Sequence, residues 1–152
     1  MILVSSCLAG NPVRYDGKAC LDNTIQQLIA EKKAVAVCPE VLGGLSTPRE
    51  PAEIVGGDGY DVLAGTAKVI AISGTDVTAE FIDGALKTLQ IAQQMNVTQV
   101  VLKEDSPSCG SNKIYSGQHD GGKIVGVGVT TALLATNGIK VISEFELEAL
   151  KK

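Results

Sequence analysis

Short apolar runs alternate along the chain with longer stretches in which apolar positions recur at helical spacing. Several of the short runs are apolar on both faces, as strands buried inside a parallel sheet are. The strand candidates are ILVS (2–5), AVAV (34–37), KVIAI (68–72), QVVLK (99–103) and KVI (140–142). The helix candidates are 22–32, which opens with Asp22 or Asn23, 77–95, 129–137, which ends at Asn137-Gly138, and 144–152.

This alternation predicts an α/β fold. We expect one domain over residues 1–152, with three layers: an open, mainly parallel, Rossmann-like sheet with helices on both faces. The segment 43–66 departs from the pattern because it is rich in glycine and proline. Loops of that length in a compact domain usually have a function. We therefore expect 43–66 to be a long, mobile loop at the rim of the sheet that covers a pocket.

The composition and net charge of the chain limit the classes of function that it can have. The chain has 152 residues, of which 45% are hydrophobic, which suffices for one compact core. A net charge of −4 provides no basic surface for a phosphate backbone, so we expect no nucleic-acid partner. The start MILVSSC has no basic leader and no apolar run reaches membrane-spanning length, which predicts a cytoplasmic protein without a membrane partner.

Three of the four cysteines follow predicted strands. Cys7 ends ILVSSC, Cys38 ends AVAVC, and Cys109 follows QVVLK after a short turn. Ligands of open α/β sheets bind outside the carboxyl ends of the strands, so we expect these three thiols to converge. Cys20, just before a helix, is interpreted as an ordinary packed or semi-exposed thiol, and a structural role is also the simplest interpretation of any single cysteine.

Three converging thiolates suit two kinds of metal centre. One is zinc with histidine or water as the fourth ligand, and the other is an iron–sulfur cluster with one iron that no side chain binds. The only histidine is His119, in the polar stretch YSGQHDGG, where we expect it to face solvent. This disfavours a zinc site completed by histidine. A cluster with an open coordination position, in contrast, allows catalysis.

Three longer motifs are similar to a known family. SSCLAGNPVRYDG (5–17), CPEVLGGLSTPREPAE (38–53) and LKEDSPSCGS (102–111) resemble the signature stretches of the DUF523 family, which includes the thiouracil desulfurases. The resemblance covers essentially the whole chain. It implies a [4Fe-4S] cluster held by Cys7, Cys38 and Cys109, and a non-redox reaction that removes sulfur from 2- or 4-thiouracil. Cys20 lies outside the three motifs.

Two residues near the cysteines are candidates for catalysis. Glu40, two positions after Cys38, can act as the base that activates water; the alternative is a charge at a helix start or a surface ion pair. The resemblance favours a catalytic role for Ser106, whose alternative role is a turn cap. We also expect the amides of Gly110 and Ser111 to donate hydrogen bonds to cluster sulfides.

Other polar residues of the motifs have less specific roles. Four of them are expected to form ion pairs that hold the loops: Arg14, Asp16, Arg49 and Glu50. Three more precede the serines and either reach a pyrimidine edge or are solvated: Lys103, Glu104 and Asp105.

Three functions remain after these steps. The first is [4Fe-4S]-dependent desulfuration of a thiolated nucleobase to uracil and sulfide, with a small thiocarbonyl compound as the partner. The second is a non-catalytic sensor or binding module that holds an iron–sulfur cluster or zinc. The third is a sulfur transferase that passes the sulfur to an acceptor. Glu40 beside a ligand and the open coordination position favour the first, and the sequence leaves the oligomeric state open.

Overall fold

A four-stranded parallel sheet forms the centre of the protein. The computed structural model describes residues 2–6, 23–46, 50–104 and 106–144. Within them the sheet has the order β2-β1-β5-β8, and each neighbouring pair is parallel. Its strands are β1 (Ile2–Ser5), β2 (Ala34–Val37), β5 (Gln99–Leu102) and β8 (Lys140–Ser143). The predicted α/β class is confirmed, and four of the five strand candidates form this sheet.

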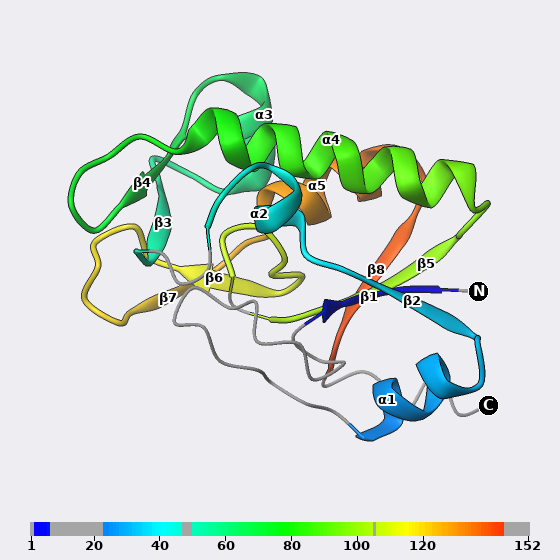
Figure 1. Ribbon diagram of the computed structural model, residues 1–152. Coiled ribbons are helices and arrows are strands. Elements are labelled where there is room, and N and C mark those ends of the chain that lie inside the picture. The colour runs from blue at the N-terminus through cyan, green and yellow to red at the C-terminus, as the bar shows by residue number, and fades with distance from the viewer. Residues whose placement is uncertain (1, 7–22, 47–49, 105, 145–152) are drawn as a thin grey trace.

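Helices cover both faces of the sheet, as Figure 1 shows. Helix α1 (Asn23–Ala30) packs on one face, and α4 (Thr78–Gln94) and α5 (Val129–Thr136) pack on the other. Successive residues of a strand point to opposite faces. The α1 face buries Val4, Ile25, Val101 and Ile142. The α4 and α5 face buries Leu3, Leu89, Val100, Leu102 and Leu134. Burial on both faces explains why ILVS and QVVL are continuous apolar runs.

The remaining strand candidate lies outside this sheet, which corrects the prediction. Strand β4 (Lys68–Ala71) pairs antiparallel with β3 (Ala52–Val55). Val69 and Ala71 are buried, whereas Lys68 is exposed and Ile72 is 57% exposed. This alternation is typical of a half-buried antiparallel strand, and it distinguishes KVIAI from the runs of the parallel sheet.

The expectation of one long loop over 43–66 is also wrong for part of its length. Besides β3, the segment contains α3 (Gly59–Ala64), and the short helix α2 (Pro39–Leu42) precedes it. The backbone N–H of Asp58 donates to Asp61 Oδ2 (2.9 Å), and that of Tyr60 donates to Asp58 Oδ1 (3.0 Å). This capping pattern starts a helix in a stretch whose glycines otherwise resemble a loop.

A β-hairpin that the sequence did not predict follows the parallel strand β5. It consists of β6 (Lys113–Tyr115) and β7 (Lys123–Val125), paired antiparallel.

The structure tests one of the predicted helix ends. Gly138 has a φ of 79°, which agrees with the predicted left-handed end of the helix before it. The predicted last helix, 144–152, lies outside the described residues except for Glu144.

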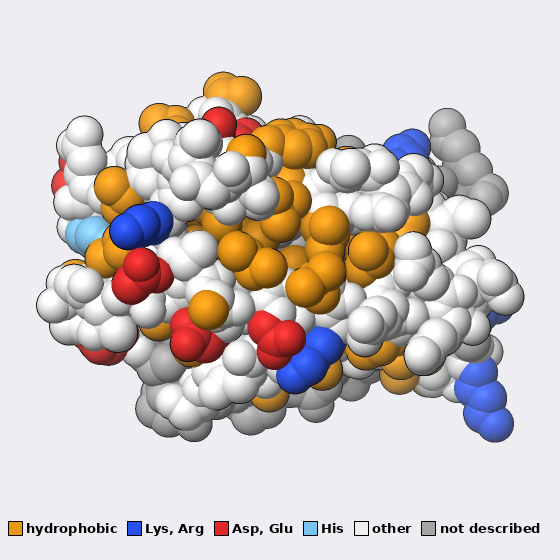
Figure 2. All heavy atoms as spheres, turned by 90° about the horizontal axis from the view of Figure 1, so that it is seen from above, with side chains coloured by type: hydrophobic (Ala, Val, Ile, Leu, Met, Phe, Trp, Pro, Cys, Tyr) orange, Lys and Arg blue, Asp and Glu red, His pale blue; other side chains and the backbone are white. Residues whose placement is uncertain are grey.

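The face that carries α4 has a mixed surface. Figure 2 shows hydrophobic side chains gathered in its middle, with carboxylates and scattered lysine or arginine side chains around them. Among the described residues, the cations on this face do not gather into one patch. No helix in the described part of the chain has the length and apolar character needed to cross a membrane.

Candidate active site

A cavity lies at the carboxyl ends of β1, β2 and β5. Its volume is about 620 Å³, within the range of about 300–1,000 Å³ of small-molecule sites. Ser5 and Ser6 at the end of β1, Cys38 after β2 and Lys103 after β5 all line it. The cavity is therefore placed where an open α/β sheet binds its ligands.

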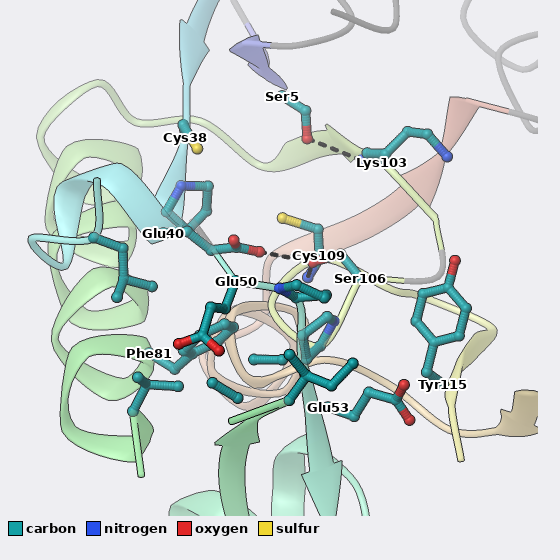
Figure 3. Close-up of a pocket in the computed structure, with 18 of the residues that line it drawn as sticks. Ser5, Cys38, Glu40, Glu50, Glu53, Phe81, Lys103, Ser106, Cys109 and Tyr115 are labelled. Carbon is teal, nitrogen blue, oxygen red and sulfur yellow. Dashed lines mark hydrogen bonds between the residues drawn. The ribbon is translucent and has the colours of Figure 1, made fainter. Parts of the chain in front are cut away.

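Cys38 and Cys109 line this cavity together, although they are far apart in the chain (Figure 3). Cys38 is half-buried, and Cys109 is buried with 6% of its surface exposed. Cys7 and Cys20 lie outside the described residues, but Ser6, directly before Cys7, lines the same cavity. The structure thus brings together two of the three predicted ligands and places the neighbour of the third beside them.

The turn that contains Cys109 is organised by Ser106. Its Oγ accepts hydrogen bonds from the backbone N–H groups of Ser108 (3.0 Å) and Cys109 (3.2 Å). This is the turn-capping role that small hydroxyl residues often have. The same Oγ donates a hydrogen bond to Glu40 Oε1 at 3.1 Å. A hydroxyl has one donor and two acceptor sites, so Ser106 uses all of them to join the Cys109 turn to the Glu40 carboxylate.

Residues at the start of α5 form hydrogen bonds with the turn that contains Cys109. The carbonyl oxygen of Cys109 accepts a hydrogen bond from Thr131 Oγ1 (3.0 Å), and Ser108 Oγ lies 2.8 Å from Thr130 Oγ1. A Cβ at Gly128 would lie only 2.4 Å from the carbonyl carbon of Ser108. Only glycine permits this close approach, so the packing against the start of α5 fixes the backbone position of Ser108 and Cys109.

Glu40 is positioned by α2, which packs against α4. A Cβ at Gly84 of α4 would lie 1.9 Å from the carbonyl oxygen of Pro39, so the two helices touch through their backbones. Lys87 Nζ also donates to the carbonyl oxygen of Leu42 (3.1 Å). Glu40 is half-buried and lines the cavity. Its carboxylate and the thiols of Cys38 and Cys109 therefore face one space (Figure 3).

Glu104 has a structural environment, contrary to the expectation that it reaches a substrate or is solvated. It is 6% exposed, and its carboxylate accepts at least five hydrogen bonds, from Ser111 N and Oγ, Asn112 N and Nδ2, and Lys113 N (2.8–3.2 Å). Burial raises the pKa of Glu104, but the hydrogen bonds from Asn112, Lys113 and Ser111 outweigh it and lower the pKa below its usual value. Glu104 thus holds the segment after Cys109.

The amides predicted to face cluster sulfides have other partners. The N–H of Ser111 donates to Glu104 Oε1 (2.8 Å), and the N–H of Gly110 donates to the carbonyl oxygen of Ser106 (2.9 Å). That expectation is therefore wrong, because the same donors close the turn around Cys109.

Of the four residues predicted to form ion pairs, the structure describes only Glu50, so the ion pairs stay a prediction. Glu50 accepts hydrogen bonds from Ser73 N (3.2 Å) and Oγ (2.9 Å), and its predicted partners Arg14, Asp16 and Arg49 lie outside the described residues, as does Asp105.

Lys103 pairs with Glu144, which follows β8, at 2.9 Å. Its backbone N–H donates to Ser5 Oγ (2.8 Å). Sequence reasoning missed Glu144, although the strand-end rule applied to β8 would have found it.

His119 lines the cavity, so the expectation that it faces solvent is wrong. Its Nδ1 lies 3.5 Å from Glu53 Oε2. Glu53 is 7% exposed and lies in β3, a strand the sequence did not predict. The only sequence signal for Glu53 is its place in the motif CPEVLGGLSTPREPAE.

The donor set fits a centre with soft ligands better than one with hard ligands. Thiolates such as Cys38 and Cys109 favour iron–sulfur clusters or zinc over magnesium or calcium. Within the described ranges, no group of three His, Cys, Asp or Glu side chains is placed to hold one metal ion. A three-thiolate centre at this cavity therefore needs a cysteine outside the described residues, either Cys7, as the sequence predicts, or Cys20.

Comparison with known proteins gives three agreeing results. The 2-thiouracil desulfurase family model matches residues 2–146. Uncharacterized protein YbbK of Bacillus subtilis (strain 168) is 58% identical over 147 residues, which span 97% of each chain. A solved [4Fe-4S]-dependent thiouracil desulfidase, TudS (DUF523Vcz), is 47% identical with a TM-score of 0.88, over 99% of this chain and 94% of the other. The chain therefore belongs to the 2-thiouracil desulfurase family, as its three motifs predicted.

Proposed function

We propose that this protein removes sulfur from a thiolated pyrimidine base such as 2- or 4-thiouracil, with a [4Fe-4S] cluster held by Cys7, Cys38 and Cys109. The family membership and the similarity to TudS support the cluster and the substrate class. The observation that carries the proposal is the convergence of Cys38, Cys109 and the Glu40–Ser106 pair in one cavity.

The reaction needs no oxidant or reductant. Water adds to the carbon of the C=S bond, its oxygen becomes the carbonyl oxygen of uracil, and sulfur leaves with two protons as hydrogen sulfide. When bound, the cluster supplies an iron with an open coordination position, which binds the soft thiocarbonyl sulfur and polarises the C=S bond.

Glu40 supplies the base for this reaction. Its carboxylate takes a proton from the attacking water and can return it to the departing sulfur. The hydrogen bond from Ser106 Oγ holds Oε1 in place at 3.1 Å. Because Ser106 also binds the N–H of Cys109, the base keeps a fixed position relative to a cluster ligand.

The apolar part of the cavity wall suits a planar ring. It contains Leu45, Val77, Pro107 and Phe81, which is only 2% exposed. These side chains give this part of the wall the apolar character that a pyrimidine ring needs. The polar groups thus lie at a few points of a largely apolar site, as is usual for small-molecule sites.

The test is anaerobic reconstitution followed by incubation with 2-thiouracil. We expect stoichiometric uracil and sulfide, and an iron–sulfur chromophore that is lost in Cys7→Ser, Cys38→Ser and Cys109→Ser. Cys20→Ser is the matched control and should keep both chromophore and turnover. An intact cluster in Cys109→Ser would contradict the ligand assignment.

The same experiment separates the alternatives. A holoprotein that binds 2-thiouracil but releases neither uracil nor sulfide would indicate a sensor or binding module. Formation of uracil with the sulfur recovered on an added acceptor instead of as free sulfide would indicate a sulfur transferase.

A further inference from the structure

His119 has a buried nitrogen without a partner in the described structure. The residue lies in the loop between β6 and β7 and lines the cavity. Its Nε2 is buried and forms no hydrogen bond with any residue that the structure describes. Buried polar atoms are almost always hydrogen-bonded, so an exception in a cavity wall needs a functional explanation.

Glu53 holds this histidine in place. Glu53 Oε1 accepts hydrogen bonds from the backbone N–H groups of Gly117 (2.8 Å) and His119 (3.2 Å), while Oε2 lies 3.5 Å from His119 Nδ1. His119 has a φ of 54°, in the left-handed region that few residues other than glycine adopt. Such a conformation persists only where the surroundings maintain it, and it is found often at ligand sites.

The Glu53 carboxylate also determines whether Nε2 of the His119 ring acts as a hydrogen-bond acceptor or donor. With Nδ1 directed at Glu53, the proton of the neutral ring belongs on Nδ1, and Nε2 becomes a hydrogen-bond acceptor. If the ring is protonated, Nε2 becomes a donor. A thiolated uracil has a ring N–H beside a C=O, so its edge offers a partner to Nε2 in either state.

We infer that His119 is a substrate-recognition residue whose Nε2 hydrogen-bonds the N–H and C=O edge of the pyrimidine, and that Glu53 is its positioning residue. This inference rests on the proposed function and adds a specificity element to it. The cavity then has two polar sides: Glu40 and Ser106 beside the cysteines, and His119 with Glu53 from the β6–β7 loop and β3.

The test compares two substrates in two proteins. 2-Thiouracil has the N–H and C=O edge, whereas pyrimidine-2-thione has the C=S group without the second carbonyl. We expect His119→Ala to raise the KM for 2-thiouracil about tenfold, the effect of one lost hydrogen bond, with a smaller change in kcat. Its kcat/KM for pyrimidine-2-thione should change little. The ratio between the substrates should therefore collapse in the variant.

Conservative variants distinguish recognition from a general structural effect. The terminal amide of glutamine reaches the position of Nε2 and can accept or donate there, whereas that of asparagine reaches only the position of Nδ1, so His119→Gln should retain more of the preference than His119→Asn. Gln118→Ala is the matched control, because Gln118 is exposed in the same loop, and it should not change the preference.

Glu53→Gln should lower the preference in the same direction as His119→Ala. The double variant should be no worse than the single variants, because both remove one interaction. Fully additive losses would show that Glu53 does not act through His119.

Isothermal titration of uracil into the holoprotein adds a readout that does not depend on turnover. Weaker uracil binding in His119→Ala than in wild type is expected. If His119→Ala keeps the wild-type substrate ratio while sulfide is released, the inference fails and the desulfuration stands. If discrimination depends on His119 but no sulfide is released, the desulfuration fails and the recognition role stands. Absence of binding by wild type to both uracil and 2-thiouracil would overturn both.

Discussion

The segments that follow β2 and β5 each bring a glutamate to the wall of the same cavity, but they surround it differently. After β5, the Glu104 carboxylate is buried under at least five hydrogen bonds from residues 111–113. After β2, the Glu40 carboxylate is half-buried and accepts a hydroxyl hydrogen bond from Ser106. The position in the fold is equivalent, so the donors around each carboxylate determine what it can do.

A carboxylate that is surrounded by donors is a poor base. The hydrogen bonds that lower the pKa of Glu104 stabilise its charged form, and they occupy the oxygens that would accept a proton. Glu104 therefore acts as an anchor for the turn of Cys109. Glu40 accepts a hydrogen bond from the neutral hydroxyl of Ser106 and lines the cavity, which suits a residue that takes up and gives back a proton.

The largest effect should come from Glu40→Gln. This variant keeps the size of the side chain and removes the base, so we expect turnover of 2-thiouracil to fall by roughly 10²–10⁴-fold. The chromophore and the urea midpoint should remain close to wild type. Glu31→Gln is the control for the charge change, because Glu31 forms an exposed ion pair with Lys33 and does not line the cavity. Undiminished sulfide release would remove Glu40 from the mechanism.

Glu104→Gln should mainly lower stability, whereas Glu40→Gln should mainly lower turnover. An amide in place of the carboxylate sets its NH₂ group against the donors of residues 111–113, so we expect a loss of about 2–3 kcal/mol in the free energy of unfolding. Urea denaturation of Glu104→Gln, with Glu31→Gln as the control, measures this loss. Turnover per folded molecule should fall much less than in Glu40→Gln. A variant as stable as wild type would mean that the hydrogen bonds to Glu104 do not hold the turn.

Ser106→Ala tests the link between the two segments. Its loss leaves the N–H groups of Ser108 and Cys109 without their acceptor and removes the hydrogen bond to Glu40. We expect a loss of about 1 kcal/mol in stability and about tenfold in turnover. In a Glu40→Gln background the same change should cost little further turnover, because the catalytic effect passes through Glu40. An equal loss in both backgrounds would assign Ser106 an independent role.

The half of the site that depends on the parallel sheet could be predicted from the sequence. Strand ends in a parallel sheet meet at one edge, so the runs before Cys38 and Cys109 suffice to bring these residues together. The roles of Glu40 and Ser106 needed the family resemblance, and they stay predictions until the variants are measured.

The other half could not be predicted. Glu53 and His119 meet through the β3–β4 and β6–β7 pairs, and of these four strands only β4 was among the strand candidates. The parallel strands are equally short but form apolar runs between helices, whereas β3, β6 and β7 differ too little from loops to be recognised without their partners. Glu104 was misjudged for a related reason, since its donors come from a turn whose backbone geometry leaves no pattern in the sequence.

The smallest expected effect is a change in the stability difference between wild type and Glu104→Gln at acidic pH. Because the folded-state pKa of Glu104 is lowered, the stability it contributes is complete above the usual glutamate pKa of about 4.3 and is lost as the pH falls through the folded value. The difference in unfolding free energy between wild type and Glu104→Gln should therefore be constant near neutral pH and narrow below about pH 4. Hydrogen bonds from Thr78 lower the pKa of Asp76 as well, but Asp76 is present in both proteins and cancels in the difference. Urea denaturation from pH 3 to pH 7 measures the gap, and a gap that widens in acid would contradict the assignment of Glu104 as a charged anchor.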